Sequence, residues 1–530
     1  MRRMLPLLLL GLPGVALAQG TPPPGAATTA APATPAAAAA PTPAAAPAGA
    51  PAPAPAPEPE EVPVAVLDAI FEGAREHFHD GDLAEAVAGF HEFLRKAPET
   101  DDRYEWSEHF MARALDALGY GHAAVEYHFN VISNRRVPRL LPESLSELER
   151  IARSRVHDRV LVEEDLLDDI EFPDHLPRRL NDFVHWVQGR RNLLRGNEAW
   201  AARSFGQIRG DGLYRMKAGM LKALWLIQRD RDAEALPLLE GLTTAEPEHS
   251  VDAVAEEVVR DDARETLARL VYGTGDHAAA RERYATIVDP RHERAHLPLE
   301  KAWTLYYAHD WPKALGLLYA LESPSFRDAF LPDKYLLRGI IYTNLCHFRA
   351  AQSAVEGFRE RFGDSLAAIR RRDDLTTNGS LMRAALETAR VKRLDTFLNS
   401  IRDERRRAAA ESEWAGDPVA KHLEELYGLE EKEVRARWRD AIEVAFRDIS
   451  AKLLDYEEQV NLLDYEVGIA LYRRVKKGEQ KAEAREALPP SIPMGGDSFY
   501  LRPGGEHWND ELHDYVVLIQ DRCDAPTRWE

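Results

Sequence analysis

Residues 77–82 have the sequence HFHDGD, which brings together two imidazole and two carboxylate groups, donor types that bind zinc. The run also suits the end of one helix and a turn into the next, because Gly81 and Asp82 favour turns. In that helix His77 and His79 would point about 200° apart and could not bind one ion. Helical zinc motifs place their ligands three or four residues apart instead. We therefore predict a helix and turn at residues 77–82, and no metal site.

A second polar group near the C-terminus contains His507, Asp510, Glu511 and His513. His507 and Glu511, or Asp510 and His513, could meet on one helical turn, but residues that cap surface turns are commoner than catalytic or metal sites. The chain has no phosphate-binding loop, no G-x-S-x-G, no H-E-x-x-H and no cysteine–histidine nucleophile arrangement. We predict no catalytic residue, no metal and no cofactor, and hence a protein that is not an enzyme.

The N-terminus has the three parts of a secretory signal peptide. Arg2 and Arg3 give a positive start, an apolar run follows from Leu5 to Leu17, and Ala16-Leu17-Ala18 forms a cleavage site. The run is too short to span a membrane, and no later stretch approaches the required length of about eighteen apolar residues. We predict a signal peptide over residues 1–18, no membrane span, and export to the periplasm of a Gram-negative bacterium.

Residues 19–63 consist almost entirely of Ala, Pro, Thr and Gly, a composition that cannot bury a core and is typical of a disordered tether. The formal net charge of −20 argues against binding to nucleic acid or to anionic membrane surfaces. Cys346 and Cys523 are the only two cysteines. They could form one long-range disulfide in an oxidising compartment, but the sequence alone does not establish it.

A repeat runs through the first two thirds of the chain. Each unit has two small residues twelve positions apart, usually followed by apolar residues four and seven positions later. Small residues let two antiparallel helices approach closely, and the large apolar residues then pack against the next pair, so the units must stack. The seven pairs are Ala74/Ala86, Ala112/Ala124, Gly189/Ala201, Ala223/Ala235, Ala268/Ala280, Ala302/Ala314 and Gly339/Ala351.

This pattern resembles the tetratricopeptide repeat (TPR), and the resemblance covers residues 64–362 with an insertion at about 137–180. The insertion is either a degenerate repeat or an inserted helix and loop. The resemblance implies an all-α fold in which helical hairpins stack into a right-handed α-solenoid with a concave groove. The residues at the expected turns and helix ends are Gly81-Asp82, Gly119, Gly196-Asn197, Gly275-Asp276, Pro98 and Pro247.

In the TPR family, the first helix of each unit lines a groove that holds a segment of a partner protein. Arginine occupies the position after the first small residue in four of the seven units, and aromatic residues occupy neighbouring positions. The resemblance therefore implies protein partners with an acidic or carboxylate-ended segment, because arginine and aromatic residues dominate binding hot spots. The alternative is that these arginines pair with acidic residues on adjacent helices. The predicted groove residues are Arg75, Trp106, Arg113, Trp186, Arg190, Arg269, Trp303 and Tyr306, with Phe71, Tyr272 and Tyr307 beside them.

Residues 363–488 are predicted to form a long antiparallel helical hairpin. Apolar residues follow a seven-residue repeat over 434–476, which is typical of a coiled-coil seam. A shorter helix precedes it, and a linker at 412–433 contains the breaker Gly416-Asp417-Pro418. We expect the hairpin to project from the solenoid; alternatively the long helix lies back on the solenoid, or pairs with another subunit to form an oligomer. The seam residues are Ile442, Phe446, Ile449, Leu453, Tyr456, Val460, Leu463, Val467 and Ala470.

Residues 489–530 form a C-terminal tail in which Phe499–Leu501 and Tyr515–Ile519 favour strands, so we predict a small β-element. The ending GGEHWNDELHDY…DRC resembles envelope-associated TPR proteins of gliding-motility machinery. Together the two resemblances imply a non-enzymatic periplasmic scaffold that binds partner proteins in a cell-envelope complex for motility, secretion or outer-membrane assembly. The alternative is a cell-wall (peptidoglycan) enzyme or its regulatory solenoid, which would need a catalytic domain with a raised-pKa glutamate.

Overall fold

A computed structural model describes residues 62–153, 167, 170–173, 175–244, 252–287, 294–476, 507 and 512–523. Over this part the chain is all-helical and contains no β-strand, so the predicted all-α class is confirmed. The predicted signal peptide and nearly all of the predicted tether lie outside the described residues, as does Phe499–Leu501. No described helix combines the length and the hydropathy that a bilayer crossing requires.

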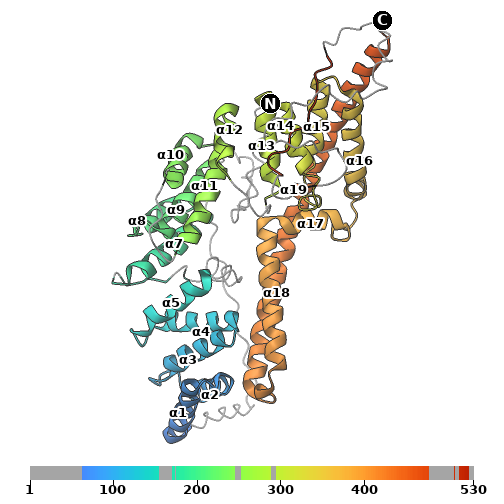
Figure 1. The fold of residues 1–530 in the computed structure, drawn as a ribbon. Coiled ribbons are helices and arrows are strands. Elements are labelled where there is room, and N and C mark those ends of the chain that lie inside the picture. Colours follow the sequence, from blue (N-terminus) through green and yellow to red (C-terminus); the bar gives the residue numbers. More distant parts are fainter. Residues whose placement is uncertain are drawn as a thin grey trace, which may run out of the picture.

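Among the described residues, seven helical hairpins follow one another and stack in order, as in an α-solenoid (Figure 1). Each predicted pair of small residues falls on the two helices of one hairpin. The hairpins are α1 (Val64–Asp80) with α2 (Leu83–Lys96), α3 (Tyr104–Ala117) with α4 (Gly121–Asn134), α7 (Arg178–Leu194) with α8 (Glu198–Gly206), α9 (Leu213–Ile227) with α10 (Asp232–Thr244), α11 (Ala253–Gly273) with α12 (His277–Ala285), α13 (His296–Tyr307) with α14 (Trp311–Ala320), and α15 (Asp333–Asn344) with α16 (Phe348–Arg371).

Small residues are needed where the two helices of a hairpin touch. In the first hairpin, a Cβ atom on Gly89 would lie 2.8 Å from the Cβ of Ala74, and Ala86 is fully buried. In the third, a Cβ on Gly189 would lie 2.4 Å from the ring of Phe205. The repeat of small residues therefore reports the close approach of two helices.

The HFHDGD run forms the predicted end of a helix and turn. Gly81 follows α1 with a φ of 91°, a left-handed conformation that favours glycine, and its N–H bonds to the carbonyl of His77. The side chain of His77 is half exposed and lies 3.7 Å from Asp82. The run therefore connects the two helices of the first hairpin.

The predicted insertion at 137–180 contains a helix, α5 (Leu140–Arg153), that packs against α4 and α7. Leu145 and Leu148 of α5 are fully buried, so this helix belongs to the stack. The predicted end of the solenoid, at residue 362, lies inside α16 and not in a loop. Helix α16 continues because Phe358, Phe362 and Leu366 extend one buried face over two further turns.

The next three helices are α17 (Gly379–Glu387), α18 (Ala389–Ala410) and α19 (Pro418–Lys476), and α18 packs along α19 as the predicted hairpin. The predicted linker at 412–433 is wrong beyond Asp417. Helix α19 starts at Pro418, a residue that suits a first helical turn, and Leu423 and Tyr427 already face the core. With 59 residues, α19 is roughly 90 Å long.

The α18–α19 hairpin does not project; it lies back on the stacked hairpins (Figure 1). Near the tip of the hairpin, α19 contacts α2 and α4, and its C-terminal half contacts α15 and α16. The predicted seam faces inward and serves these contacts, since Leu453, Val460 and Val467 are at most 1% exposed. Helix α19 thus connects the first hairpins of the stack with the last.

The described end of the tail runs along α14 and the turn between α15 and α16. The N–H of Val517 bonds to the carbonyl of Pro312, and Cys523 forms a disulfide with Cys346 in the α15–α16 turn. The bridge that the sequence left open is therefore present. The predicted β-element is not found at Tyr515–Ile519, because this extended segment lies against helix α14 and pairs with no other strand among the described residues.

Candidate partner-binding surface

The predicted groove arginines of the first two hairpins are exposed. Arg75 on α1 pairs with Glu72, one turn away, at 2.6 Å. Arg113 on α3 places its guanidinium 5.3 Å from the ring centre of Phe78. Both cations therefore remain accessible to an acidic segment, although Arg75 already has a carboxylate partner.

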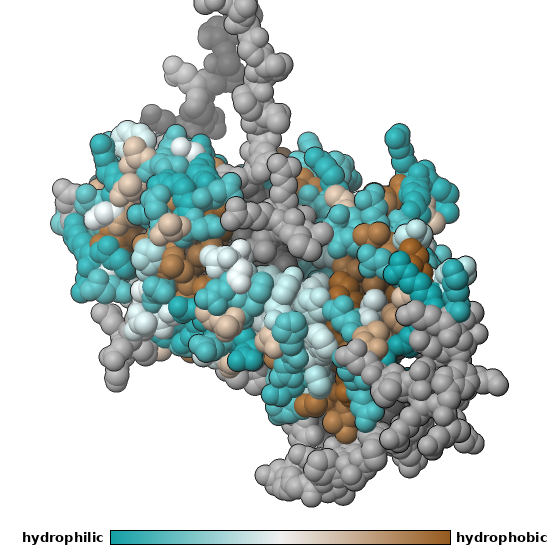
Figure 2. Space-filling view, turned by 90° about the horizontal axis from the view of Figure 1, so that it is seen from above, coloured by the Kyte–Doolittle hydropathy of each residue, from teal (hydrophilic) through white to brown (hydrophobic). Residues whose placement is uncertain are grey.

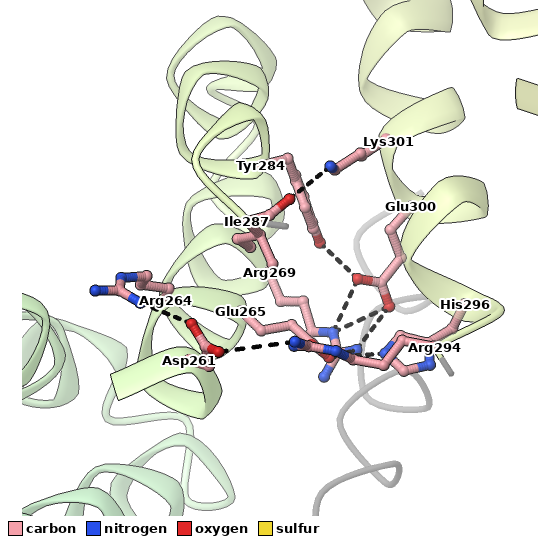
Figure 3. A network of polar contacts seen from close by, with 10 residues as sticks. All are labelled: Asp261, Arg264, Glu265, Arg269, Tyr284, Ile287, Arg294, His296, Glu300 and Lys301. Atoms are coloured by element: carbon pink, nitrogen blue, oxygen red, sulfur yellow. Dashed lines mark hydrogen bonds and ion pairs between the residues drawn. The ribbon is translucent and has the colours of Figure 1, made fainter. Parts of the chain in front are cut away.

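Arg190 and Arg269, in contrast, are buried, with 6% and 5% of their surface exposed. Arg269 belongs to a polar network between α11, α12 and α13 (Figure 3). Its Nε donates to both carboxylate oxygens of Glu300 at 3.0 and 3.1 Å, and the guanidinium also pairs with Glu265. Tyr284 donates its hydroxyl to Glu300 at 2.9 Å. Arg269 therefore follows the alternative in which the arginine pairs with acidic residues of an adjacent helix.

Glu265 is the second carboxylate of this network, and its surroundings keep it in the charged form. Burial by itself would raise the pKa of Glu265, but a hydrogen bond from His296 and the charge of Arg269 lower it to about 2. Arg294 also donates to Glu265 at 3.0 Å. The positive charges of Arg269 and Arg294 thus balance the negative charges of Glu265 and Glu300. The network holds α11, α12 and α13 together.

The predicted tryptophans Trp106 and Trp186 each carry a cation over the ring. The guanidinium of Arg139 lies 4.1 Å from the ring centre of Trp106, and the ammonium of Lys217 lies 4.4 Å from that of Trp186. Trp186 is only 5% exposed. These two tryptophans lie in different hairpins, and the cations beside them already occupy a ring face.

Trp303 and Tyr306 lie together in an aromatic cluster on α11, α12 and α13, which consists of Tyr272, His277, Trp303, Tyr306 and Tyr307. The ring centre of Tyr307 is 5.1 Å from that of Tyr306, 6.0 Å from Tyr272 and 6.3 Å from Trp303. His277 stacks on Tyr307 at 3.9 Å with the planes 9° apart. Tyr307 is 45% exposed, and the other four side chains are partly buried. The aromatic cluster therefore offers ring edges and faces to solvent.

Behind the aromatic cluster are residues of α15 and α19 that sequence reasoning missed. Asp333, at the start of α15, interacts with the side chains of Trp303 and Tyr456. Burial raises the pKa of Asp333 to about 6, and burial also lowers the pKa of the nearby Lys452. An acid at a helix start is a local signal that could have identified Asp333. Tyr456 and Lys452 come from α19, and no local pattern places them here.

The aromatic cluster has the composition of a binding surface. Aromatic rings bury large areas at low cost in conformational entropy, and Asp333 lies beside Trp303. Asp333 itself is 7% exposed and so has little access to a ligand. Within the described ranges, no group of three or more His, Cys, Asp or Glu side chains is placed to hold a metal ion; Asp510 and Glu511 lie outside those ranges. Seen from above, the coloured part of the face in view is largely hydrophilic, with hydrophobic residues in a strip on the right and a smaller patch on the left (Figure 2).

No protein-family model matches the chain, and a search of curated proteins finds no match to it. Function must therefore be argued from the chain's own residues. The aromatic cluster is the place where two of the predicted groove residues, Trp303 and Tyr306, contact each other, with ring centres 5.9 Å apart. We take it as the candidate partner-binding surface.

Proposed function

We propose that the protein is a non-enzymatic scaffold, exported to the periplasm of a Gram-negative bacterium, whose TPR-like hairpins bind partner proteins of a cell-envelope complex. The complex serves motility, secretion or outer-membrane assembly. The aromatic cluster supports this proposal most, because it gathers four ring side chains around the exposed Tyr307. Tyrosine and tryptophan are enriched in the hot spots of protein interfaces.

The disulfide between Cys346 and Cys523 supports the export part of the proposal. Disulfides persist in oxidising compartments such as the periplasm and are rare in the cytosol. We also propose that the partner presents an acidic or carboxylate-ended segment, but fewer arginines are available to bind it than the sequence implied. Because Arg190 and Arg269 are buried, an acidic partner segment would meet Arg75 and Arg113 at the first two hairpins.

The alternative of a peptidoglycan enzyme has less support from the described residues. Glu108, Asp333 and Glu404 have pKa values raised by burial to about 7, 6 and 6. They are only 4%, 7% and 3% exposed. A glycosidase acid must reach the bond that it cleaves, and these three groups are enclosed by protein. Asp262, whose pKa burial also raises to about 6, is partly exposed on α11.

Affinity capture from envelope extracts tests the proposal with the variant Tyr307→Ser. We expect recovery of the specific partners to fall by about tenfold, because a hot-spot aromatic contributes about 1.4 kcal/mol or more. Trp200→Ser is the matched control, since Trp200 is 57% exposed on α8, away from the cluster. Equal recovery with both variants would contradict the aromatic cluster as the binding surface. Release of soluble muropeptides from peptidoglycan by the purified protein would contradict the non-enzymatic role.

A further inference from the structure

Helix α19 carries a second row of apolar residues on the face opposite its buried seam. Val460, Leu463 and Val467 of the buried seam are at most 5% exposed. Leu462 and Tyr465, each two positions further along the helix, are 60% and 67% exposed. Residues two apart on a helix point about 200° from each other, so the two rows lie on opposite faces. Other described residues bury the inward row, whereas the outward row stays exposed.

The outward row has the spacing of a coiled-coil seam. Successive residues of the row are alternately four and three positions apart, like the a and d positions of heptads. The row extends over about 27 Å of helix. Each member is exposed or partly exposed, and Tyr472 is 66% exposed. We call this row the outer seam; its members are Glu458, Leu462, Tyr465, Ile469, Tyr472 and Lys476.

The outer seam is complementary to the same seam on a second, antiparallel copy of the helix. Its steps read the same in both directions, so an antiparallel copy places Leu462 opposite Tyr472 and Tyr465 opposite Ile469. The same arrangement places the carboxylate of Glu458 opposite the ammonium of Lys476 at both ends. A parallel copy would instead place each charge opposite an identical charge, which is repulsive.

Gly468 lies beside the outer seam and gives a second reason to expect a close neighbour. A Cβ atom on Gly468 would meet only open space in the single chain. Glycine destabilises the interior of a helix, and no described residue approaches this position closely enough to require it. Beside a helix seam, a glycine lets the backbone of a second helix approach closely.

We propose that two copies of this protein associate through the outer seam, with α19 against α19 in an antiparallel, two-fold symmetric pair. A two-fold contact uses the same patch on both copies, and the outer seam supplies its own apolar and charged complement at all six positions. This inference concerns self-association and does not depend on the partner-binding function proposed above.

Sedimentation equilibrium of the purified protein tests the proposal directly. A seam of this length is at the small end of specific interfaces, so we expect a reversible dimer with a dissociation constant on the order of 10 μM. Leu462→Asp should weaken it by at least about a hundredfold, because it places a charge in the apolar centre. Leu429→Asp is the matched control, since Leu429 is 71% exposed on the same helix but outside the outer seam. Circular dichroism should show unchanged helicity for both variants.

Charge reversal tests the direction of the pair. Glu458→Lys alone and Lys476→Glu alone should each weaken the dimer by about tenfold, because two attractive pairs become repulsive. The double variant should recover the wild-type dissociation constant, since each reversed charge again faces its opposite. A protein that stays monomeric at every concentration overturns the proposal. It does so whatever covers the outer seam instead, whether residues 477–506 or another protein. A dimer that is insensitive to Leu462→Asp, or to the single reversals, overturns it equally.

Discussion

The tip and the base of the α18–α19 hairpin attach to the stacked hairpins through different chemistry. At the tip joint, against α2 and α4, Trp414 is fully buried and donates its indole N–H to the carbonyl of Ala84 at 2.9 Å. Glu404 accepts the hydroxyl of Tyr427 at 2.7 Å and the backbone N–H of His122 at 3.1 Å. These contacts are polar, and the buried His91 and His122 and the partly buried His422 lie beside them.

At the base joint, against α15 and α16, α19 packs through buried apolar residues, with the ion pairs Arg359–Asp464 and Arg370–Glu457 at the surface of the joint. Leu463 lies so close to Gly339 that a Cβ atom on Gly339 would be 2.4 Å from the Leu463 side chain. The Cys346–Cys523 disulfide, with a Cα–Cα distance of 5.2 Å, ties the tail beside this joint. Arg474 of α19 donates to the carbonyl of Cys346 at 3.3 Å. The base joint should therefore respond to redox conditions, and the two joints should respond to pH with opposite signs, which lets them be separated experimentally.

Trp414→Ala should have the largest effect, and it should act on the tip joint alone. Removing a buried tryptophan costs about 3–5 kcal/mol of stability, and here it also removes the indole hydrogen bond to the Ala84 carbonyl. Hydrogen exchange should show faster opening in α2, α4 and the end of α18, with α15 and α16 unchanged. Trp200→Ala is the control and should change stability by less than about 0.5 kcal/mol. Equal loss of protection in both joints would show that the hairpin opens as one unit.

Cys523→Ser should weaken the base joint and leave the tip joint intact. The disulfide closes a sequence separation of 177 residues, and loss of such a bridge costs about 2–4 kcal/mol. We expect faster proteolysis of the tail and faster exchange at the α15–α16 turn. Reducing agent should reproduce the effect on the wild-type protein and leave the Cys523→Ser variant unchanged. Loss of protection at α2 or α4 would contradict separate joints.

Lowering the pH from 7 to 5 should loosen the tip joint. Burial lowers the pKa of His122 and of His91 to about 4, and it lowers the pKa of His422 as well. An opened joint would restore values near 6.5, so the closed form binds fewer protons and loses stability as the pH falls from 6.5 towards 4. His122 alone accounts for about 2 kcal/mol at pH 5. Glu404, with its pKa raised to about 6, offsets about 1 kcal/mol of this loss.

The base joint should respond to the same change with the opposite sign. Burial raises the pKa of Asp333 to about 6, so acidification stabilises its closed, protonated form by about 1 kcal/mol. At the tip, Arg95 further lowers the pKa of His91, while Asp417 raises it and Glu425 raises that of His422. Hydrogen exchange, corrected for its intrinsic pH dependence, should show α2 and α4 opening more at pH 5, and α15 opening less. Parallel changes in both regions would contradict this assignment.

The sequence predicted what depends on neighbours along the chain. The pairs of small residues located all seven hairpins, and the heptads located the buried seam of α19, because helices repeat over short distances. The attachment of the hairpin could not be predicted in this way, since Glu404 and His122 lie 282 positions apart. Arg269 was misplaced for a similar reason: its partner Glu300 is on another helix, 31 positions later. The outer seam escaped notice because its apolar residues alternate with those of the stronger inner pattern.

Glu404→Gln should have the smallest effect at neutral pH and sharpens the pH comparison. Glutamine keeps an acceptor for Tyr427 and for the N–H of His122, so stability at pH 7 should change by no more than about 1 kcal/mol. The folded pKa of Glu404 lies above its ordinary value, so the wild-type carboxyl takes up a proton between pH 7 and 5 and partly compensates the histidines. Without that compensation, the variant should lose about 1 kcal/mol more than the wild type over this range. Identical pH profiles would mean that Glu404 does not titrate when the tip joint is closed.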